Sequence, residues 1–481
     1  MTTVLQGPQL ARLLGRWQGG RNVPDYAALA ATVRGLVSDG RLPLGVRLPA
    51  ERELAVALGI SRTTVSAAYR TLRETGHLTS RRGAGSWTTM PGGARVGHHG
   101  LWALASDADL LDLGSAALPA PPQLAAAAAE ALDDLPRYLS GPGYLPSGLV
   151  ELRAAVAQLF AARGLATGPD QIMITSGVQH ALDLALRLLV PAGQPVLVES
   201  PTYPNALAAI VGRRGRVLTH GLLPESGWDA ELLLATLRQN QPRVAYLVPE
   251  FQNPTGHLMA QPLRERLPRA AHVSGTDLVV DESFVDLTLD ETPLPPPVAS
   301  FDRHARVLSI GGMSKPFWGG LRIGWIRAAA PLVQRLAALR IGVDMAGPVL
   351  DQLVAARLLR YRDAVLAQRR PELRAQRDAL VSALATELPE WRLRVPAGGL
   401  SLWVELDAPI SGALSRAAQS YGVRLAAGPR FGMDGTMERY LRLPYTLPAG
   451  QLTDAVKRIA AARGDLDRPA RRTWESPALV A

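Results

Sequence analysis

An alternation of short apolar runs with helical stretches constrains the fold of this chain more than any other feature. Six runs are typical of strands, and they lie at residues 171–177, 194–201, 243–250, 276–283, 306–312 and 322–328. Strands that alternate with helices usually form a mainly parallel sheet that helices cover on both faces. The sequence therefore predicts a large α/β domain beyond residue 107.

Length and residue types exclude several classes of protein. A chain of 481 residues is too long for one ordinary core. No window approaches the roughly 18 apolar residues of a membrane span, and the N-terminus lacks the apolar core of a signal peptide. The absence of cysteine excludes disulfides and thiolate metal sites, and the eight histidines have no HExxH spacing. We therefore expect a cytoplasmic protein with no membrane contact and no metal.

Positive charge is concentrated at the start of the chain. Residues 1–90 contain 12 arginines and 5 acidic residues, whereas the net charge of the whole chain is +10. This asymmetry indicates a polyanionic partner for the N-terminal end, although a basic surface can also serve only for solubility. Charge alone does not decide between these two interpretations.

Turn residues divide the N-terminal part into short helical stretches, which occupy residues 25–40, 50–59 and 62–75. Gly59 ends the second stretch, and Ser61 can cap the third. Two short helices joined by a glycine turn, with polar residues leading the second, are typical of a helix-turn-helix. Residues 77–89 then predict two short strands around a glycine-rich tip, a wing whose arginines would contact phosphates or the minor groove.

The stretch from Leu48 to Ser86 resembles the winged helix-turn-helix of the GntR regulators without a gap. The resemblance implies a DNA-binding domain over residues 1–89, a double-stranded DNA operator as its partner, and a linker over residues 90–107. It also implies a set of DNA-contacting residues, namely Arg52, Ser61, Arg62, Thr63, Ser66, Arg82 and Gly83. The alternative is a winged helix reused for protein contacts.

Polar residues follow several of the predicted strands of the large domain. The turn Ser176-Gly177-Val178-Gln179 opens a helix, so that its N–H groups can bind an anion. Asn253 can donate to a phenolic oxygen, and Asp281 can stabilise a protonated ring nitrogen. Lys315 and Arg322 follow a fifth strand, at a spacing that lets one bond a cofactor and the other its phosphate. Together these residues indicate a site for a phosphorylated, nitrogen-containing ring.

Residues 108–465 resemble the fold-type I pyridoxal-phosphate enzymes, in particular the aminotransferases, through the motifs SKPFWGGLRIGW and QNPTG. The resemblance implies a mainly parallel sheet covered by helices, a smaller C-terminal α+β subdomain, and a tail over residues 466–481. It also implies that pyridoxal 5′-phosphate contacts Tyr144, Ser176, Gly177, Val178, Gln179, Tyr203, Asn253, Asp281, Ser314, Lys315 and Arg322.

The resemblance gives some of these residues individual roles. Lys315 forms the internal aldimine, and Tyr203 stacks on the ring. Arg442 is similar to the arginine that holds a substrate's α-carboxylate, here that of an effector. Tyr144 matches a tyrosine that reaches the phosphate of the partner subunit, which implies a homodimer. Arginine cannot replace Lys315, because its pKa stays above about 12.

A purely structural role is an alternative interpretation for three of these residues. Tyr203 could belong to the ordinary core, Asp281 could cap a loop, and Arg442 could pair with Glu438 or another acidic residue. The chain also departs from the family pattern at two positions. No tyrosine follows Asp281 in the segment 281–285, and Gly312 stands where the family often has serine. We expect these two departures to impair fast transamination more than they impair cofactor binding.

A GntR-like winged helix followed by an aminotransferase-like domain is the architecture of the MocR subfamily of transcriptional regulators. The resemblance implies a regulator that binds pyridoxal phosphate at Lys315 and senses an amine, an amino acid or vitamin B6 through the aldimine. One alternative is an active aminotransferase that carries a DNA-binding domain. Another is a DNA-binding protein whose large domain is only a dimerisation scaffold.

Overall fold

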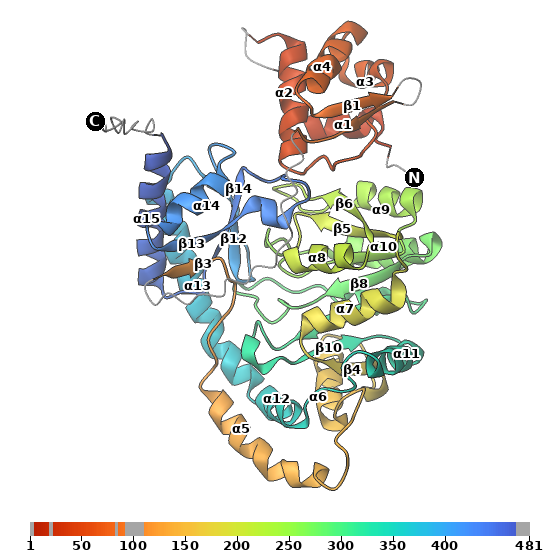
Figure 1. The fold of residues 1–481 in the computed structure, drawn as a ribbon, viewed down its shortest axis with the longest axis vertical. Coiled ribbons are helices and arrows are strands. Elements are labelled where there is room, and N and C mark those ends of the chain that lie inside the picture. Colours follow the sequence, from red (N-terminus) through yellow and green to blue (C-terminus); the bar gives the residue numbers. More distant parts are fainter. Residues whose placement is uncertain (1–3, 19–22, 82–84, 92–109, 468–481) are drawn as a thin grey trace, which may run out of the picture.

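The structure is a computed structural model that describes residues 4–18, 23–81, 85–91 and 110–467. These residues form a small helical unit at the N-terminal end and a larger α/β unit (Figure 1). Most of the predicted linker and of the predicted C-terminal tail lies outside the described residues. Among the described residues, no helix is both long and apolar enough to cross a membrane.

The N-terminal unit is a winged helix. Its helices are α1 (Gly7–Leu14), α2 (Asp25–Ser38), α3 (Glu51–Leu58) and α4 (Arg62–Glu74). Its wing is the antiparallel pair of β1 (Leu78–Arg81) and β2 (Gly85–Thr88). The predicted helices α2 to α4 and both wing strands are present, whereas the sequence analysis did not foresee α1.

Local chemistry explains the boundaries of the helix-turn-helix. The N–H of Thr64 donates to Oγ of Ser61 over 3.1 Å, which caps the start of α4. Gly59 has a left-handed backbone with φ of +66°, and it ends α3 so that α4 can turn away. Leu54 of α3 and Val65 of α4 are fully buried in the core of the unit. The turn and the apolar faces together fix the angle between the two helices.

The larger unit is built on a seven-stranded sheet with strand order β4-β10-β9-β8-β7-β5-β6. The strands are β4 (Ile172–Thr175), β5 (Pro195–Ser200), β6 (Arg216–Gly221), β7 (Val244–Leu247), β8 (Asp277–Asp281), β9 (Val307–Gly312) and β10 (Gly324–Arg327). Strands β5 to β9 pair in parallel with their neighbours, and β10 is antiparallel to both β4 and β9. The mainly parallel sheet is therefore confirmed, and each predicted run contains a strand.

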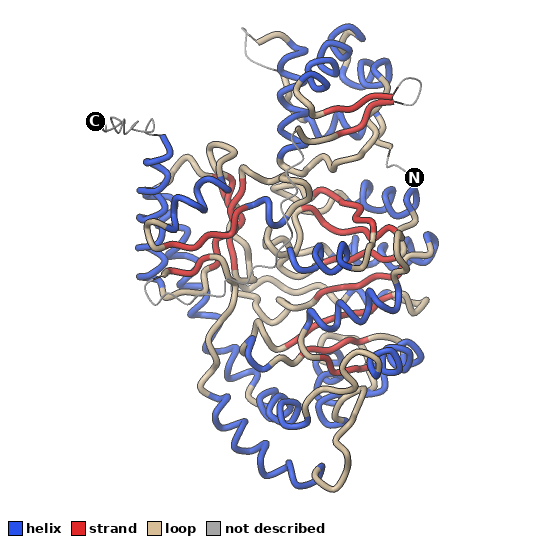
Figure 2. The backbone as a smooth tube through the Cα atoms, viewed as in Figure 1, coloured by secondary structure: helices blue, strands red, loops and turns tan. Residues whose placement is uncertain are grey.

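Helices cover both faces of this sheet (Figure 2). They are α5 (Gln123–Asp134), α6 (Val150–Ala161), α7 (Val178–Leu189), α8 (Pro204–Gly212), α9 (Ala230–Asn240), α10 (Gln261–Ser274), α11 (Ala330–Ile341) and α12 (Val349–Arg360). Side chains of β5 alternate between two buried clusters, since Val196 and Val198 belong to one and Leu197 to the other. This alternation is what a strand buried on both faces requires.

A second sheet of five strands forms a smaller part near the C-terminal end, in the order β11-β12-β14-β13-β3. Its strands are β3 (Leu111–Leu113), β11 (Arg392–Leu393), β12 (Ser401–Glu405), β13 (Val423–Ala427) and β14 (Tyr440–Pro444). The helices α13 (Arg362–Glu387), α14 (Ser411–Gln419) and α15 (Ala449–Asp467) accompany it. This is the smaller α+β subdomain that the resemblance implied.

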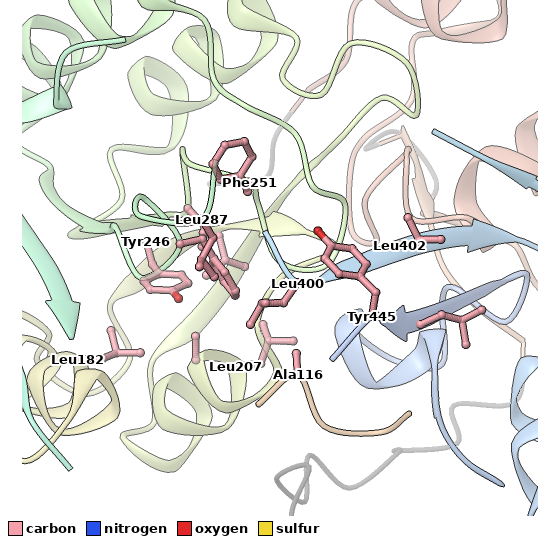
Figure 3. Packing of buried hydrophobic residues seen from close by; sticks show 14 of the residues in the cluster. Ala116, Leu182, Leu207, Tyr246, Phe251, Leu287, Leu400, Leu402 and Tyr445 are labelled. Carbon is pink, nitrogen blue, oxygen red and sulfur yellow. The ribbon is translucent and has the colours of Figure 1, made fainter. Parts of the chain in front are cut away.

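One buried cluster joins the two sheets. It includes Tyr246 of β7 and Leu207 of α8 on the side of the large sheet, and Leu402 of β12 and Tyr445 on the side of the small sheet (Figure 3). Because the cluster is continuous, the two sheets share a core, and residues from both can form one site between them.

Candidate functional site

Lys315 lies just after β9, and its amine is enclosed by the fold. Nζ donates a hydrogen bond to the carbonyl of Ala116 over 2.8 Å and lies 5.7 Å from the centre of the Phe284 ring. Burial lowers the pKa of Lys315 to about 8, the charge of Arg442 adds to this, and Asp281 opposes it. A lysine with such a pKa has a sizeable neutral fraction near neutral pH, so its amine can attack a carbonyl carbon.

Asp281 ends β8 inside the fold, and hydrogen bonds hold its carboxylate. Oδ2 accepts from the hydroxyl of Tyr246 over 2.7 Å, and Oδ1 accepts from Ser283 through both its N–H and its Oγ. Burial raises the pKa of Asp281, and these hydrogen bonds together with Lys315 act in the opposite direction. The carboxylate is thus oriented by three donors and suited to accept a bond from a protonated ring nitrogen.

The turn before α7 and Arg322 lie against each other. Gly177 is the N-terminal cap of α7, with φ of +92°, and a Cβ at this position would lie 3.0 Å from Nη2 of Arg322. The same Nη2 donates to the carbonyl of Ser176 over 2.8 Å. Only glycine allows this close approach of an arginine to the N-terminus of a helix. A helix N-terminus and a guanidinium together form an anion-binding corner.

Other groups of this turn have partners of their own. The N–H of Ser176 donates to Nδ1 of His180 over 3.1 Å. Nε2 of Gln179 donates to the carbonyl of Asn205 over 3.3 Å. Val178 is the first residue of α7 and is half-buried.

Tyr203 and Asn253 lie on buried loops at the ends of the central strands. Tyr203 precedes α8, its hydroxyl accepts from Nδ2 of Asn205 over 2.8 Å, and burial raises its pKa to about 12. Asn253 follows β7 and is 9% exposed. Charges of Asp281, Arg442 and Arg322 act on the Tyr203 hydroxyl, which places Tyr203 among the predicted site residues.

Arg442 lies on β14 of the small sheet and is almost fully buried. Its Nη2 donates to the carbonyl of Gly114 over 2.5 Å, and the guanidinium lies 5.0 Å from the centre of the Phe431 ring. Nε of Arg442 is buried and has no hydrogen-bond partner among the described residues. Burial lowers the pKa of Arg442, but the guanidinium keeps its charge near neutral pH. A buried guanidinium with an unused donor is suited to bind a carboxylate.

Glu438 is not the partner of Arg442, which removes one alternative interpretation. Its carboxylate instead accepts from Oγ of Ser411 over 3.2 Å and from the N–H of Gly412 over 2.8 Å. Ser314 is half-buried directly before Lys315. Tyr144 is 60% exposed on the loop before α6, as expected of a side chain that reaches toward another subunit.

The two departures from the family pattern have visible consequences. Phe284 lies beside the Lys315 amine and has no hydroxyl to donate. Gly312 is tightly enclosed, because a Cβ there would lie 2.9 Å from Cγ2 of Val178 and 3.0 Å from the carbonyl of Ile323. A serine at this position therefore requires the neighbouring residues to move.

The predicted DNA-contacting residues lie around the first turn of α4. Arg52, Ser61, Arg62 and Thr63 are exposed, and Ser66 is half-buried. Nε of Arg62 lies 3.6 Å from the carboxylate of Glu51, a weak surface pair that DNA can replace. Arg82 and Gly83 lie outside the described residues. Of the described members, Arg52 lies on α3, and the others lie at the N-terminal end of α4, where a recognition helix contacts base edges.

The sequence analysis did not identify several residues of the site. Tyr246 and Ser283 hold Asp281, and the carbonyls of Gly114 and Ala116 accept hydrogen bonds from Arg442 and Lys315. A tyrosine within an apolar strand is a usable signal, because a buried hydroxyl needs a partner. Backbone carbonyls have no such signal, since every residue type carries one.

The fold and the site define a class of protein. A winged helix with an exposed recognition helix is joined to a fold-type I domain, and that domain places an amine, a carboxylate and two guanidinium groups around one partly buried site. The class is that of DNA-binding regulators whose second domain has the fold of pyridoxal-phosphate enzymes.

Comparisons with known proteins identify the family. The model of the aminotransferase class I and II family matches residues 108–459, and that of the gntR family of bacterial regulatory proteins matches residues 25–87. The chain is 28% identical to the uncharacterized HTH-type transcriptional regulator YisV of Bacillus subtilis, over 93% of this chain and 98% of that protein. It is 30% identical to the probable rhizopine catabolism regulatory protein MocR of Rhizobium meliloti, over 63% and 65% of the two chains.

A solved structure agrees with this assignment. LysN, an α-aminoadipate aminotransferase from Thermus thermophilus complexed with N-(5′-phosphopyridoxyl)-L-leucine, superposes with a TM-score of 0.67. The two sequences are 32% identical, over 74% of this chain and 93% of that one. The chain belongs to the class I and II aminotransferase family and, through its GntR domain, to the MocR subfamily of transcriptional regulators. It is a DNA-binding transcriptional regulator, and the cofactor of its family is pyridoxal 5′-phosphate.

The residues present fit this cofactor. The corner of Gly177 and Arg322 suits a phosphate, and Asp281 suits a ring nitrogen. Lys315 offers an amine of lowered pKa, and Nε of Arg442 is a buried donor without a partner among the described residues. These groups provide the donors, the acceptor and the nucleophile that a phosphorylated pyridine aldehyde requires.

Proposed function

We propose that this regulator senses an amine, an amino acid or vitamin B6 at the site around Lys315, with pyridoxal 5′-phosphate as its cofactor. The single observation that carries the proposal is the half-buried Lys315 amine, which donates to the carbonyl of Ala116 over 2.8 Å and whose pKa burial lowers to about 8. When bound, the cofactor supplies an aldehyde that forms a reversible covalent bond with primary amines. Lys315 is the amine of this chain that can make that bond, and an effector amine competes with it for the same carbon.

The surrounding residues give the site its selectivity. Gly177 and Arg322 would hold the phosphate, Asp281 the ring nitrogen, and Tyr203 the face of the ring. Arg442, with its buried Nε, favours an effector that carries a carboxylate beside its amine. An amino acid therefore fits the proposed site better than a simple amine does.

Through the DNA-binding domain, effector binding at the site around Lys315 would change the affinity of the protein for DNA. An effector that binds one state of the large domain better than another shifts the population toward it. Two winged helices in a homodimer, with Tyr144 reaching into the partner's site, would contact half-sites about one helical turn or a multiple apart. The 60% exposure of Tyr144 supports this arrangement.

An active aminotransferase is the second candidate, and the likeness to LysN favours it. The positions of Phe284 and Gly312 argue against fast turnover, because the hydroxyl groups that the family places there are missing. Incubation with the twenty standard amino acids and a keto acid separates the two candidates. Multiple turnovers without operator binding would contradict the regulator proposal.

The cofactor bond at Lys315 has a direct test, because the chain has only one other lysine, Lys457. With pyridoxal 5′-phosphate, the wild type and Lys457→Ala should show visible absorption, and Lys315→Ala should not. Borohydride reduction followed by peptide mass spectrometry should place the added mass on Lys315. A colourless wild type in the presence of excess cofactor would overturn the proposal.

A further inference from the structure

The winged-helix unit contacts both parts of the larger unit through one short segment. This segment, the α2 turn (residues 38–42), follows the end of α2. It meets the end of β5 and β6 of the large sheet on one side, and the residues just before β14 of the small sheet on the other. In Figure 1 the winged-helix unit lies at the end of the molecule where β5 and β6 are found.

The contact with the small sheet is specific. The N–H of Met437 donates to the carbonyl of Ser38 over 2.8 Å. Asp39 is 7% exposed and lies 3.0 Å from Arg41 and 4.0 Å from Arg439. Gly40 has φ of +66°, and a Cβ there would lie 2.2 Å from Cε of Met437. Three contacts together hold the turn in one position. They are a backbone hydrogen bond, a buried carboxylate near two arginines, and a glycine with no space for a side chain.

The contact with the large sheet is equally close. A Cβ at Gly221, the last residue of β6, would lie 2.4 Å from the carbonyl oxygen of Arg41 and 2.9 Å from that of Gly40. A Cβ at Gly40 would also lie 3.2 Å from Oγ of Ser200, the last residue of β5. Leu232 of α9 packs against the core of the winged helix beside this contact. The turn therefore fits between two backbones and cannot shift on one side without affecting the other.

Both contacted segments run directly into the candidate site. Ser200 lies three residues before Tyr203, and Met437 lies five residues before Arg442. The N–H of Thr202 also donates to the carbonyl of Phe431 over 2.9 Å, and Phe431 lies under the Arg442 guanidinium. A ligand that moves Tyr203 or Arg442 thus moves the residues that hold the turn.

We propose that the α2 turn is the contact through which occupancy of the site around Lys315 changes the position and freedom of the winged helix. This inference rests on the proposed function and adds to it the surface that carries the signal. By linkage, a ligand that changes DNA affinity through this contact is itself bound more or less tightly when DNA is bound.

Two pairs of glycine variants of the full chain test the proposal. In Gly40→Ala the new methyl group would clash with Met437. In Gly45→Ala the residue also has a positive φ, of +75°, and so a similar conformational cost, but nothing lies within 4 Å of the new methyl group. Gly221→Ala presses on the backbone of Arg41 from the large sheet, whereas Gly212→Ala meets nothing within 4 Å. Each pair separates pressure on the contact from the general cost of the substitution.

The measurement is the dissociation constant for a DNA fragment that the wild type selects from a random library. It is made at one salt concentration with no addition, with pyridoxal 5′-phosphate, and with the cofactor plus the twenty standard amino acids. In the wild type and in both control variants the additions should change the constant by about 5-fold or more. In Gly40→Ala and Gly221→Ala the change should fall below about 2-fold, and the Met437 amide should exchange hydrogen faster than in the control variants.

The outcomes distinguish this inference from the proposed function. If both test variants respond to the additions as strongly as their controls, the α2 turn does not carry the signal, and the proposed function still stands. If the wild type captures the cofactor at Lys315 but its DNA affinity never responds, both proposals fail. An equal loss of response in Gly45→Ala and Gly40→Ala would also overturn the inference, because strain alone would then explain it.

Discussion

At the scale of single residues, the site is governed by charges that the fold brings together from distant parts of the sequence. Burial is the main cause of the lowered pKa of Lys315, and the charge of Arg442 lowers it further, although Arg442 lies on the small sheet and Lys315 beside the large one. Asp281 opposes this effect. Arg442 therefore has two roles in the proposed function, as a carboxylate ligand and as a group that keeps the Lys315 amine neutral.

Arg442→Met should separate these two roles. The variant keeps a long side chain but removes the positive charge, so the pKa of Lys315 should rise toward its ordinary value. Since only the neutral amine captures an aldehyde, the pH at which pyridoxal 5′-phosphate is captured at half the maximal rate should move upward. Stopped-flow absorbance between pH 6 and pH 10 measures this midpoint, and Arg416→Met, a change of an exposed arginine of α14, is the control. An unchanged midpoint would show that Arg442 does not act on Lys315.

At the scale of elements, α4 is the part of the DNA-binding domain that the structure presents most openly. Arg62 is exposed at the start of α4. Among the described residues its ion-pair partner is Glu51 of α3, whose carboxylate lies 3.6 Å from Nε of Arg62. Arg12 of α1 is also exposed, but it is close enough to Glu231 of the large unit to act on its charge. The two arginines thus lie on different sides of the winged helix.

Arg62→Ala should weaken specific DNA binding by about 1–3 kcal/mol and should leave the cofactor absorption intact. The physical reason is the loss of a charged, multidentate donor at the N-terminal end of the recognition helix. A salt-controlled shift assay with specific and scrambled fragments measures the effect, and Arg12→Ala is the matched control. Equal losses in the two variants would assign the effect to net charge and not to base contact.

The elements also illustrate how far the sequence could predict the fold. Helices α2 to α4 and the strands β4, β5 and β7 to β10 were predictable, because capping residues, glycines and apolar runs mark their ends. β6 was missed, because His220 and Thr219 interrupt its apolar pattern although the fold buries His220. In the small sheet, β3 and β11 have only three and two residues, and the side chains of β11 are not fully buried, so that no apolar run stands out there.

The site was predictable where a residue type carries the chemistry. Lys315, Asp281, Arg322 and Arg442 are such residues, and the structure brings them close to one another, with Asp281 and Arg442 buried, Lys315 half-buried and Arg322 exposed. The bond between Arg442 and Gly114 was not predictable, because its acceptor is a backbone carbonyl that lies 328 residues away in the sequence. The position of the α2 turn was equally hidden, since it depends on the space that Gly40 and Gly221 leave.

At the scale of the whole molecule, the contact between the two units encloses a histidine. His220 of β6 is buried, and neither of its ring nitrogens has a hydrogen-bond partner among the described residues. It lines a cavity of about 20 Å³ together with Leu5 and Leu42 of the winged helix. Burial lowers the pKa of His220 to about 4, and Asp229 opposes this. The docked state therefore disfavours protonation of this ring.

Stability should consequently fall as the pH decreases. His220 takes up a proton near pH 6.5 when it is exposed but only near about pH 4 in the folded chain. The contribution of His220 to the free energy of unfolding is thus fully present above about pH 6.5. It is lost progressively as the pH falls from about 6.5 to about 4. Urea unfolding at pH 7.5 and pH 5.5 should show a smaller loss in His220→Leu than in the wild type. His304→Leu, a change of an exposed histidine, should behave as the wild type does. Equal losses in all three proteins would contradict the prediction.

The placement of β3 has a practical consequence for the construction of chimeras and truncated proteins. Leu111–Leu113 pairs in parallel with β13 at the edge of the sheet that carries Arg442, and the next residues accept hydrogen bonds from Arg442 and Lys315. A truncated protein that begins beyond Ala116 therefore loses an edge of its sheet and two acceptors of its site. An exchange of DNA-binding domains between relatives should join the two sequences ahead of Leu111, so that the host domain keeps its own β3.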